Sequence, residues 1–214
     1  MNNILNVVYI NLDSRPDRQL QTVRELTKIG VRNATRFSAI LHSNGCIGCF
    51  QSHVQVLEHA IKNRWNHVLI VEDDIMFTLP DLLTAQLARF MENHKPKRDW
   101  DVLMLGGNNI GDVKIMDDTC VQVKRCYSAV AYLVSGHYMT TLLAHLKEGI
   151  RMLIRYPTQK SRYAIDVWWT HLQIKHKWLL LVPLSVSQHP SYSDIENKET
   201  NYHNVMLTLV KHRV

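Results

Sequence analysis

Three consecutive carboxylates, Glu72-Asp73-Asp74, are the residues of this sequence whose types and spacing most clearly point to chemistry. They follow Val68-Leu69-Ile70-Val71, an unbroken apolar run typical of a central strand that is buried on both faces. Because an unpaired buried carboxylate is costly, we expect this strand to end in an open crevice next to a cationic group. Ligands of α/β sheets bind in such crevices, and carboxylate oxygens suit Mg²⁺ or Mn²⁺ with positions left for a diphosphate. The alternative is an acidic loop that caps the next helix.

Polar residues also follow the first predicted strand, which covers residues 4–10. Asn11, Arg15 and Arg18 lie in the turn and first helical residues after it, and the helix is expected to end near Gly30. Because the planar arginine side chain suits phosphate oxygens, these residues are candidates for binding a nucleotide, with solvated arginines as the alternative. The apolar spacing predicts that the buried stripe of this helix consists of Leu20, Val23, Leu26 and Ile29.

Two further candidates lie in the second half of the chain. Asp166 stands beside Trp168 and Trp169 in an apolar, predicted helical segment, where the pKa of a carboxyl can be tuned for base chemistry. An N-cap or a buried ion pair is the alternative for Asp166, and core packing is the alternative to sugar binding for the tryptophans. His189 lies in a polar, turn-rich segment and is a candidate metal ligand.

The four cysteines do not indicate a zinc or redox site. Cys46 and Cys49 form a C-x-x-C pair, but Cys120 and Cys126 are more widely spaced than the second pair of a usual zinc site. We therefore expect free, structural thiols in a reducing compartment.

Length and composition favour one globular domain. The chain has 214 residues, 46% hydrophobic content, a net charge of +6 and no apolar run of membrane-spanning length. With a strand predicted almost at the start and no signal peptide, a cytoplasmic protein is expected. The basic charge suits phosphorylated substrates or peripheral contact with an anionic membrane surface, whereas no nucleic-acid-binding module is recognisable. Neither a P-loop nor a G-x-G-x-x-G pattern is present.

Strands alternate with helices early in the chain and become less regular later, which predicts one mixed α/β domain. We expect residues 121–123 and 129–134 to form a hairpin, residues 136–147 a helix, and residues 151–162 an irregular basic segment.

Four blocks of the sequence resemble glycosyltransferase family 25, the lipooligosaccharide-type sugar transferases and related procollagen galactosyltransferases. The blocks are Val8–Arg18, Gly48–His53, Leu69–Asp74, and Gln188 together with Ser193–Ile195. They occur in the order found in that family and extend over nearly the whole chain.

The resemblance implies a GT-A-type, Rossmann-like fold with a mixed central sheet, formed by a nucleotide-binding half (about 1–110) and an acceptor-binding half (about 111–214). It also implies a UDP-sugar donor, commonly UDP-galactose, a divalent metal, usually Mn²⁺, and inversion at the anomeric carbon. The expected acceptor is a hydroxyl of a glycan, such as lipooligosaccharide, or of hydroxylysine.

Within this reaction, Asp74 would hold the metal with help from Glu72 or Asp73, and His189 would add a ligand from the far end of the chain. Asp166 is our candidate for the base that deprotonates the acceptor hydroxyl, followed by Asp194 and then Glu72. The nucleotide side is assigned to Asn11, Arg15, Arg18, Ser52, His53 and Asp73, with a hydrogen-bonded core histidine as the alternative for His53.

Three other functions fit parts of the pattern. A glycosidase would use Glu72 and Asp74 as its acid and base, although two acids on one strand cannot readily flank a glycosidic bond. A non-catalytic sugar- or nucleotide-binding module would not require three adjacent acids. A nucleotidyltransferase would share the metal and the crevice but consume a triphosphate.

Overall fold

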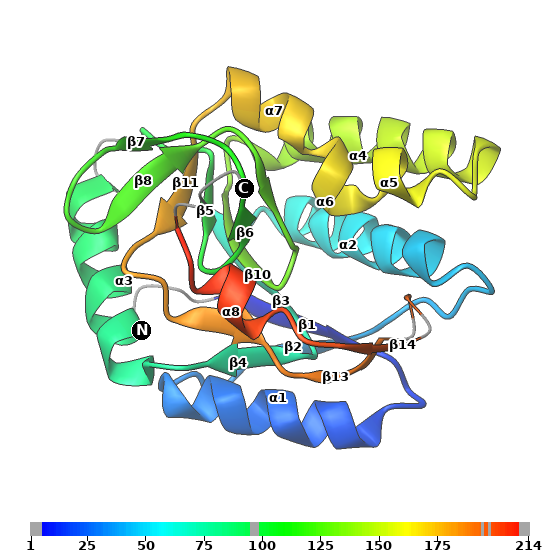
Figure 1. Cartoon of the computed structure of the whole chain (residues 1–214), viewed down its shortest axis with the longest axis horizontal. Helices are drawn as coiled ribbons and strands as arrows, with labels where there is room; N and C mark the ends of the chain where they lie inside the picture. The colour runs from blue at the N-terminus through cyan, green and yellow to red at the C-terminus, as the bar shows by residue number, and fades with distance from the viewer. Residues whose placement is uncertain (1–5, 95–98, 194, 197, 210–214) are drawn as a thin grey trace.

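The computed structural model describes residues 6–94, 99–193, 195–196 and 198–209, which are built around one mixed eight-stranded sheet (Figure 1). In spatial order its strands are β2 (Thr35–Ser38), β1 (Val7–Asn11), β3 (His67–Glu72), β10 (Ala131–Ser135), β5 (Val102–Met104), β11 (Trp178–Leu181), β8 (Cys120–Val123) and β7 (Val113–Ile115). The pairs β1–β2, β1–β3 and β5–β11 are parallel, and the remaining pairs are antiparallel. The predicted α/β class with a mixed central sheet is therefore confirmed.

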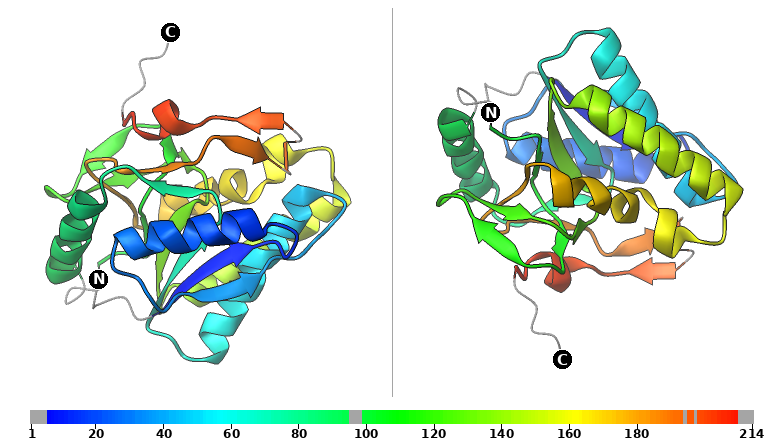
Figure 2. Two further views of the ribbon diagram at one scale, coloured as in Figure 1. Left: turned by 90° about the horizontal axis from the view of Figure 1, so that it is seen from below. Right: turned by 90° about the horizontal axis from the view of Figure 1, so that it is seen from above.

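Helices cover both faces of the sheet (Figure 2). The helices α1 (Pro16–Lys28) and α3 (Pro80–His94) pack on one face. The other face is covered by α2 (Gly45–Lys62), α4 (Met139–Arg155), α5 (Lys160–Tyr163), α6 (Ile165–Trp168) and α7 (Thr170–Lys175). None of the helices in the described ranges is both long enough and apolar enough to span a bilayer.

The central strand β3 is buried on both faces, as its unbroken apolar run predicts. The side chains of residues 68–71 have no exposed surface. Val68 and Ile70 pack against the α2 and α4 side, whereas Leu69 and Val71 pack against the α1 and α3 side. This alternation is expected for a strand between two helical layers and fixes the direction in which β3 delivers its terminal acids.

The predicted buried stripe of α1 is half wrong. Leu26 and Ile29 are buried, but Leu20 and Val23 are 54% and 43% exposed. Two polar anchors rotate the helix: the Thr22 hydroxyl donates to the backbone oxygen of Asp73 at 3.0 Å, and Glu25 accepts a hydrogen bond from a backbone N–H of β4 (Ile75–Phe77) at 2.9 Å. These contacts tie α1 to the segment that follows β3.

Two other predicted features differ from the structure. β8 does not form a hairpin with β10: β10 inserts between β3 and β5, and β8 pairs with β7 and β11. The chain between β8 and β10 instead forms β9 (Cys126–Tyr127), which pairs with β6 (Asn108–Asn109). The segment 151–162 is also less irregular than expected, because α4 continues to Arg155 and α5 begins at Lys160.

The C-terminal segment folds back across the molecule to the end of β3. Its strand β12 (Val186–Gln188) runs antiparallel to β4, with Gln188 opposite Ile75. The hairpin of β13 (Ser191–Ser193) and β14 (Lys198–Thr200) follows, and then α8 (His203–Met206). This pairing brings residues from two distant parts of the chain to the carboxyl edge of the parallel strands.

Candidate active site

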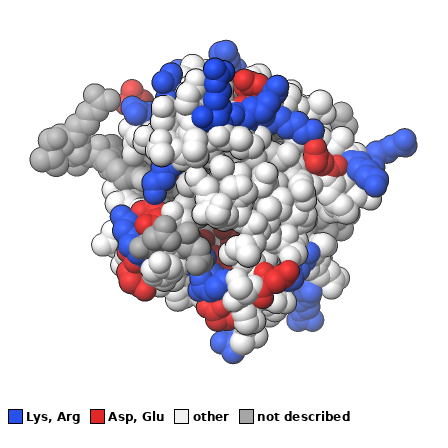
Figure 3. All heavy atoms as spheres, turned by 90° about the vertical axis from the view of Figure 1, so that its right-hand side faces the viewer, with Lys and Arg blue, Asp and Glu red and all other residues white. Residues whose placement is uncertain are grey.

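The acids of β3 lie at the sheet edge where the parallel strands β1 and β3 both end. Ile10 is paired with Glu72, and the side-chain amide of Asn11 donates to Oδ2 of Asp73 at 2.8 Å. The antiparallel strand β10 begins at the same edge, opposite Val71. On one face of the molecule, acidic atoms lie deep in a hollow beside a basic side chain (Figure 3). The acids thus lie at the carboxyl ends of the parallel strands, and we infer that this hollow is the predicted crevice.

Asp73 is held by an ion pair with Arg18. Nη1 of Arg18 donates to Oδ1 of Asp73 at 2.9 Å, and Nη2 donates to Ser191 Oγ at 2.8 Å and to the Tyr192 backbone oxygen at 2.9 Å. Burial raises the pKa of Asp73, while Arg18 and Asn11 oppose that shift. Asp73 and Arg18 therefore join α1, the end of β3 and the C-terminal segment.

Replacing Arg18 with Met should lower the free energy of unfolding by about 3 kcal/mol, because it leaves the largely buried Asp73 carboxylate without its cation. Chemical denaturation at pH 8 measures this loss. Asp73→Asn in the same background should recover part of it, whereas Arg89→Met, which removes an exposed ion pair, should cost less than about 1 kcal/mol. Equal losses for Arg18→Met and Arg89→Met would contradict this account.

Asp74 has one carboxylate oxygen without a hydrogen-bond partner. Its Oδ2 accepts a hydrogen bond from Gln188 Nε2 at 3.1 Å, and its backbone oxygen accepts one from the His189 N–H at 2.6 Å. Oδ1 is buried and accepts no hydrogen bond from the described part of the chain. Burial, reinforced by the charge of Glu72, raises the pKa of Asp74 to about 7, although Arg18 opposes the shift. A buried carboxylate oxygen of this kind needs either a proton or a cation.

The same shift makes a prediction for stability in the absence of metal. Since the folded-state pKa of Asp74 lies above its unfolded value of about 3.8, the unfolded chain binds fewer protons between these values. Ionisation of Asp74 therefore destabilises the fold as pH rises from about 4 to about 7. Asp74→Asn should remove this penalty, so its stability relative to wild type should be about 1–3 kcal/mol more favourable at pH 8 than at pH 5.

Thermal and chemical unfolding in EDTA at both pH values measure that difference. Asp13→Asn is the matched control, because the pKa of Asp13 is lowered by hydrogen bonds from Arg36 and Ser38. Its effect on stability should be the same at pH 5 and pH 8. A difference between Asp74→Asn and wild type that does not change with pH would contradict the raised pKa.

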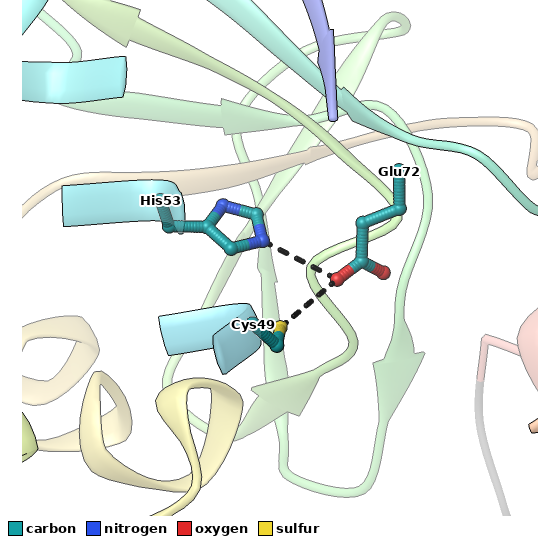
Figure 4. Close-up of side chains that lie close together, drawn as sticks. All are labelled: Cys49, His53 and Glu72. Atoms are coloured by element: carbon teal, nitrogen blue, oxygen red, sulfur yellow. Dashed lines mark hydrogen bonds and ion pairs between the residues drawn. The ribbon is translucent and has the colours of Figure 1, made fainter. Parts of the chain in front are cut away.

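Glu72 lies against two side chains of α2 (Figure 4). The Cys49 thiol donates to Oε1 of Glu72 at 3.7 Å, and His53 Nε2 lies 3.3 Å from the same oxygen. His53 Nδ1 is 2.7 Å from the Tyr132 hydroxyl, so the buried imidazole has a partner on each nitrogen. Burial and the charge of Glu72 raise the pKa of the Cys49 thiol. Glu72 is therefore held in place from the α2 side.

Asp166 approaches the acids from α6. Its Oδ2 accepts a hydrogen bond from the backbone N–H of Ser128 at 3.0 Å, and Ser128 has a positive φ of 76°. Burial raises the pKa of Asp166; the Ser128 hydrogen bond opposes this shift, and the negative charge of Glu72 adds to it. Glu72 thus acts electrostatically on both Asp74 and Asp166.

Two other predicted site residues, Ser52 and Arg15, already form hydrogen bonds within the protein. Ser52 is fully buried; its hydroxyl donates to the Gly48 backbone oxygen at 2.8 Å and accepts from the Ile40 N–H at 2.9 Å. Arg15 donates to both carboxylate oxygens of Asp17, at 3.0 and 2.9 Å. Asp194 lies outside the described residues.

His189 and the tryptophans occupy different environments. The His189 ring is partly buried and forms no hydrogen bond within the residues that the structure describes. Trp169 is fully buried and donates to the Cys126 backbone oxygen at 3.1 Å. Trp168 is partly buried and lines a pocket of about 420 Å³ with Tyr163 and His171. Core packing, the alternative interpretation, therefore describes Trp169.

The donor set suits a hard divalent cation. The unpaired Asp74 Oδ1 and the partly exposed Glu72 carboxylate provide oxygens at the strand end, and His189 adds a ring without a partner in the described ranges. Oxygen-rich sets with open positions favour Mg²⁺ and Mn²⁺ over softer ions. These donor types suit the metal that the sequence suggested, but the ligand atoms of Glu72, Asp74 and His189 do not all lie within 4.8 Å of one another in the described residues, so a metal at Asp74 stays a prediction.

In open α/β sheets ligands bind outside the carboxyl ends of the strands, and the acids of β3 lie at such an end. A family model described as "Glycosyltransferase family 25 (LPS biosynthesis protein)" matches residues 34–158, and the chain belongs to this family.

A human relative, named "Inactive glycosyltransferase 25 family member 3", is 25% identical over 151 residues. The match covers 70% of this chain but only 22% of that protein, so the chain spans about a fifth of the relative's length. Among solved structures, mannose-1-phosphate geranyltransferase from Thermus thermophilus has a TM-score of 0.49 at 8% identity, covering 82% of this chain and 72% of that one. A nucleoside-diphosphate-sugar pyrophosphorylase from Vibrio cholerae has a TM-score of 0.38 at 14% identity, covering 86% and 76%.

The structure gives contacts in the site to residues to which the sequence analysis assigned no role there. Gln188 binds Asp74, Ser128 positions Asp166, and Tyr132 and Cys49 hold the His53–Glu72 pair. Only the spacing of Cys49 and His53, four residues apart on a predicted helix, was a visible signal of a shared helical face.

Proposed function

We propose that this chain is a metal-dependent glycosyltransferase that moves a hexose, galactose or glucose, from a UDP-sugar to a hydroxyl of a glycan or of hydroxylysine, with inversion. The observation that carries this proposal is the buried, unpaired Oδ1 of Asp74, and the charge of Glu72, which raises the pKa of both Asp74 and Asp166, supports it. Family membership supports the transferase class.

In this proposal Asp74 and Glu72 hold the metal, and His189 is positioned by the bond of its N–H to Asp74. Bound Mn²⁺ or Mg²⁺ would neutralise the diphosphate as it departs. Asn11, Arg15 and Arg18 form the nucleotide side of the crevice, with Asp73 fixing Arg18. Ser52 and His53 support the site indirectly. The Ser52 hydroxyl holds the start of α2 through the Gly48 backbone oxygen, and His53 holds the Glu72 side chain.

Asp166 is the proposed base for the acceptor hydroxyl. Its raised pKa makes it a better proton acceptor than an ordinary aspartate, and the Ser128 N–H fixes one oxygen so that the other is left for the substrate. Asp194 remains the alternative base; it follows β13 in the sequence and lies outside the described residues.

A second candidate function is a non-catalytic nucleotide- or sugar-binding module. The name of the human relative, which describes it as inactive, and the ion pair that occupies Asp73 favour this alternative. It would retain nucleotide binding without turnover.

A panel of UDP-sugars with Mn²⁺, with and without glycan and hydroxylysine acceptors, separates these functions. Release of UDP that depends on both metal and acceptor is the expected result. Binding of UDP without release would instead support the binding module, and consumption of UTP with release of pyrophosphate would indicate a nucleotidyltransferase.

A further inference from the structure

Three chemically different ligand groups meet beside the crevice at Cys49, His53 and Glu72 (Figure 4). Cys49 and His53 are four residues apart on α2, so their side chains share one face of the helix. Glu72 reaches them from the end of β3. The Sγ, imidazole nitrogen and carboxylate oxygen all lie within 4.8 Å of one another.

The two separations that involve Glu72 Oε1 match a tetrahedral metal site, and the third, from sulfur to the imidazole nitrogen, is within 4.8 Å. Ordinary zinc bond lengths and a tetrahedral angle require N···O separations of about 3.3–3.5 Å and S···O separations of about 3.5–3.7 Å. The observed distances to Glu72 Oε1 are 3.3 Å from His53 Nε2 and 3.7 Å from Cys49 Sγ. An ion could therefore bind between the three atoms with little movement of either element.

The contact between Tyr132 and His53 is of the kind that orients a metal-binding histidine. The Tyr132 hydroxyl lies 2.7 Å from His53 Nδ1, and both residues are fully buried. Such a partner on one ring nitrogen fixes the imidazole plane and directs the other nitrogen towards an ion. Sulfur, nitrogen and oxygen together favour Zn²⁺ or Co²⁺ over Mg²⁺ and Mn²⁺.

The other histidine–cysteine group in the described residues consists of His94, Asp117 and Cys120, and it differs from the first in having a carboxylate on each side of the imidazole. Both ring nitrogens of His94 already lie against carboxylates, at 3.0 Å from Asp99 and 2.8 Å from Asp117. Asp117 Oδ1 also accepts hydrogen bonds from the N–H groups of Thr119 and Cys120. This group is therefore an ion-pair cluster between α3 and β8, and it provides a control for the first.

We propose that Cys49, His53 and Glu72 form a Zn²⁺ site with one open position, which shares the Glu72 carboxylate with the metal site proposed at Asp74. The thiol proton passes to solvent when the ion binds. The sequence did not indicate such a site, because the partner of Cys49 is a histidine four residues on and not Cys46. The proposal does not depend on sugar transfer, since metal binding is measured without a substrate.

The direct test is titration of the reduced, metal-free chain with Co²⁺, which reports thiolate ligation by a sulfur-to-cobalt charge-transfer absorption. We expect this absorption to saturate at one Co²⁺ per chain and to disappear when Zn²⁺ is added. Cys49→Ser should abolish it, whereas Cys46→Ser and Cys120→Ser should retain it. Absence of the absorption, or its survival in Cys49→Ser, would show that the three residues form only a hydrogen-bonded cluster.

A second measurement avoids dependence on the folding of Cys49→Ser. The sequence has four cysteines, so Cys49 is the sole thiol in a Cys46→Ser, Cys120→Ser and Cys126→Ser triple variant. X-ray absorption of this variant loaded with zinc should show one sulfur ligand among nitrogen and oxygen ligands. A zinc coordination shell that contains only nitrogen and oxygen ligands would overturn the proposal.

Discussion

Asp74→Asn is expected to lower kcat for sugar transfer by about 10³-fold while leaving the chain folded, because loss of a metal ligand removes about 4 kcal/mol of transition-state stabilisation. The neutral amide keeps the size of the side chain and its contact with Gln188 but cannot supply an anionic oxygen to a cation. UDP release from the productive donor, measured over a range of Mn²⁺ concentrations, checks this result.

The matched control is Asp112→Asn, since Asp112 is exposed and directly precedes β7 at the far edge of the sheet. It should keep wild-type turnover. Normal turnover of Asp74→Asn at saturating Mn²⁺ would remove Asp74 from the mechanism. In combination with the predicted gain in metal-free stability, the variant should be more stable yet inactive, which is the expected trade-off for a buried functional carboxylate.

Asp166→Asn should lower kcat by about 10²–10⁴-fold while the Kd for UDP stays within about twofold of wild type, because the change removes a proton acceptor and no donor ligand. Asparagine retains an oxygen that can accept the Ser128 N–H, so the local backbone should be preserved. Steady-state kinetics and calorimetric titration with UDP and Mn²⁺ separate the two effects.

The pH profile provides an independent check on Asp166. Because burial raises the pKa of this carboxyl, the acidic limb of the wild-type kcat profile should lie above the range of an ordinary aspartate. If the affinity for UDP-sugar falls instead of kcat, Asp166 is a ligand of the donor sugar and not the base.

The sequence predicts the central strand well because its signal is local. Val68–Val71 has no polar interruption, and the three acids directly after it mark the end of the strand. The α/β class follows from the early alternation of strands and helices. The position of the acids at a shared edge then follows from the parallel pairing of β1 and β3.

The orientation of α1 was not predictable from apolar spacing alone. Leu20 and Val23 fit the stripe, but the hydrogen bonds of Thr22 and Glu25 decide which face turns inwards. These bonds reach residues 51 and 52 positions away. A pattern within one helix contains no information on partners at that distance.

The sequence predicted which residue types form the candidate site, but it did not predict which of them contact one another. Gln188 meets Asp74, 114 positions away in the chain, only because β12 pairs with β4. Ser128, which lies between β9 and β10, meets Asp166, which is 38 positions away in the chain. Long-range strand pairing therefore determines which polar residues become neighbours, and short motifs do not encode it.

The most direct test of the account is a crystal structure of the full chain with UDP and Mn²⁺, in which anomalous diffraction locates the metal. We expect Mn²⁺ bound directly to Asp74 Oδ1 and bridged to the diphosphate, with the carboxylate still held by Gln188 through Oδ2. An anomalous peak and UDP bound elsewhere, with Asp74 protonated or paired to a neighbouring side chain, would contradict the account.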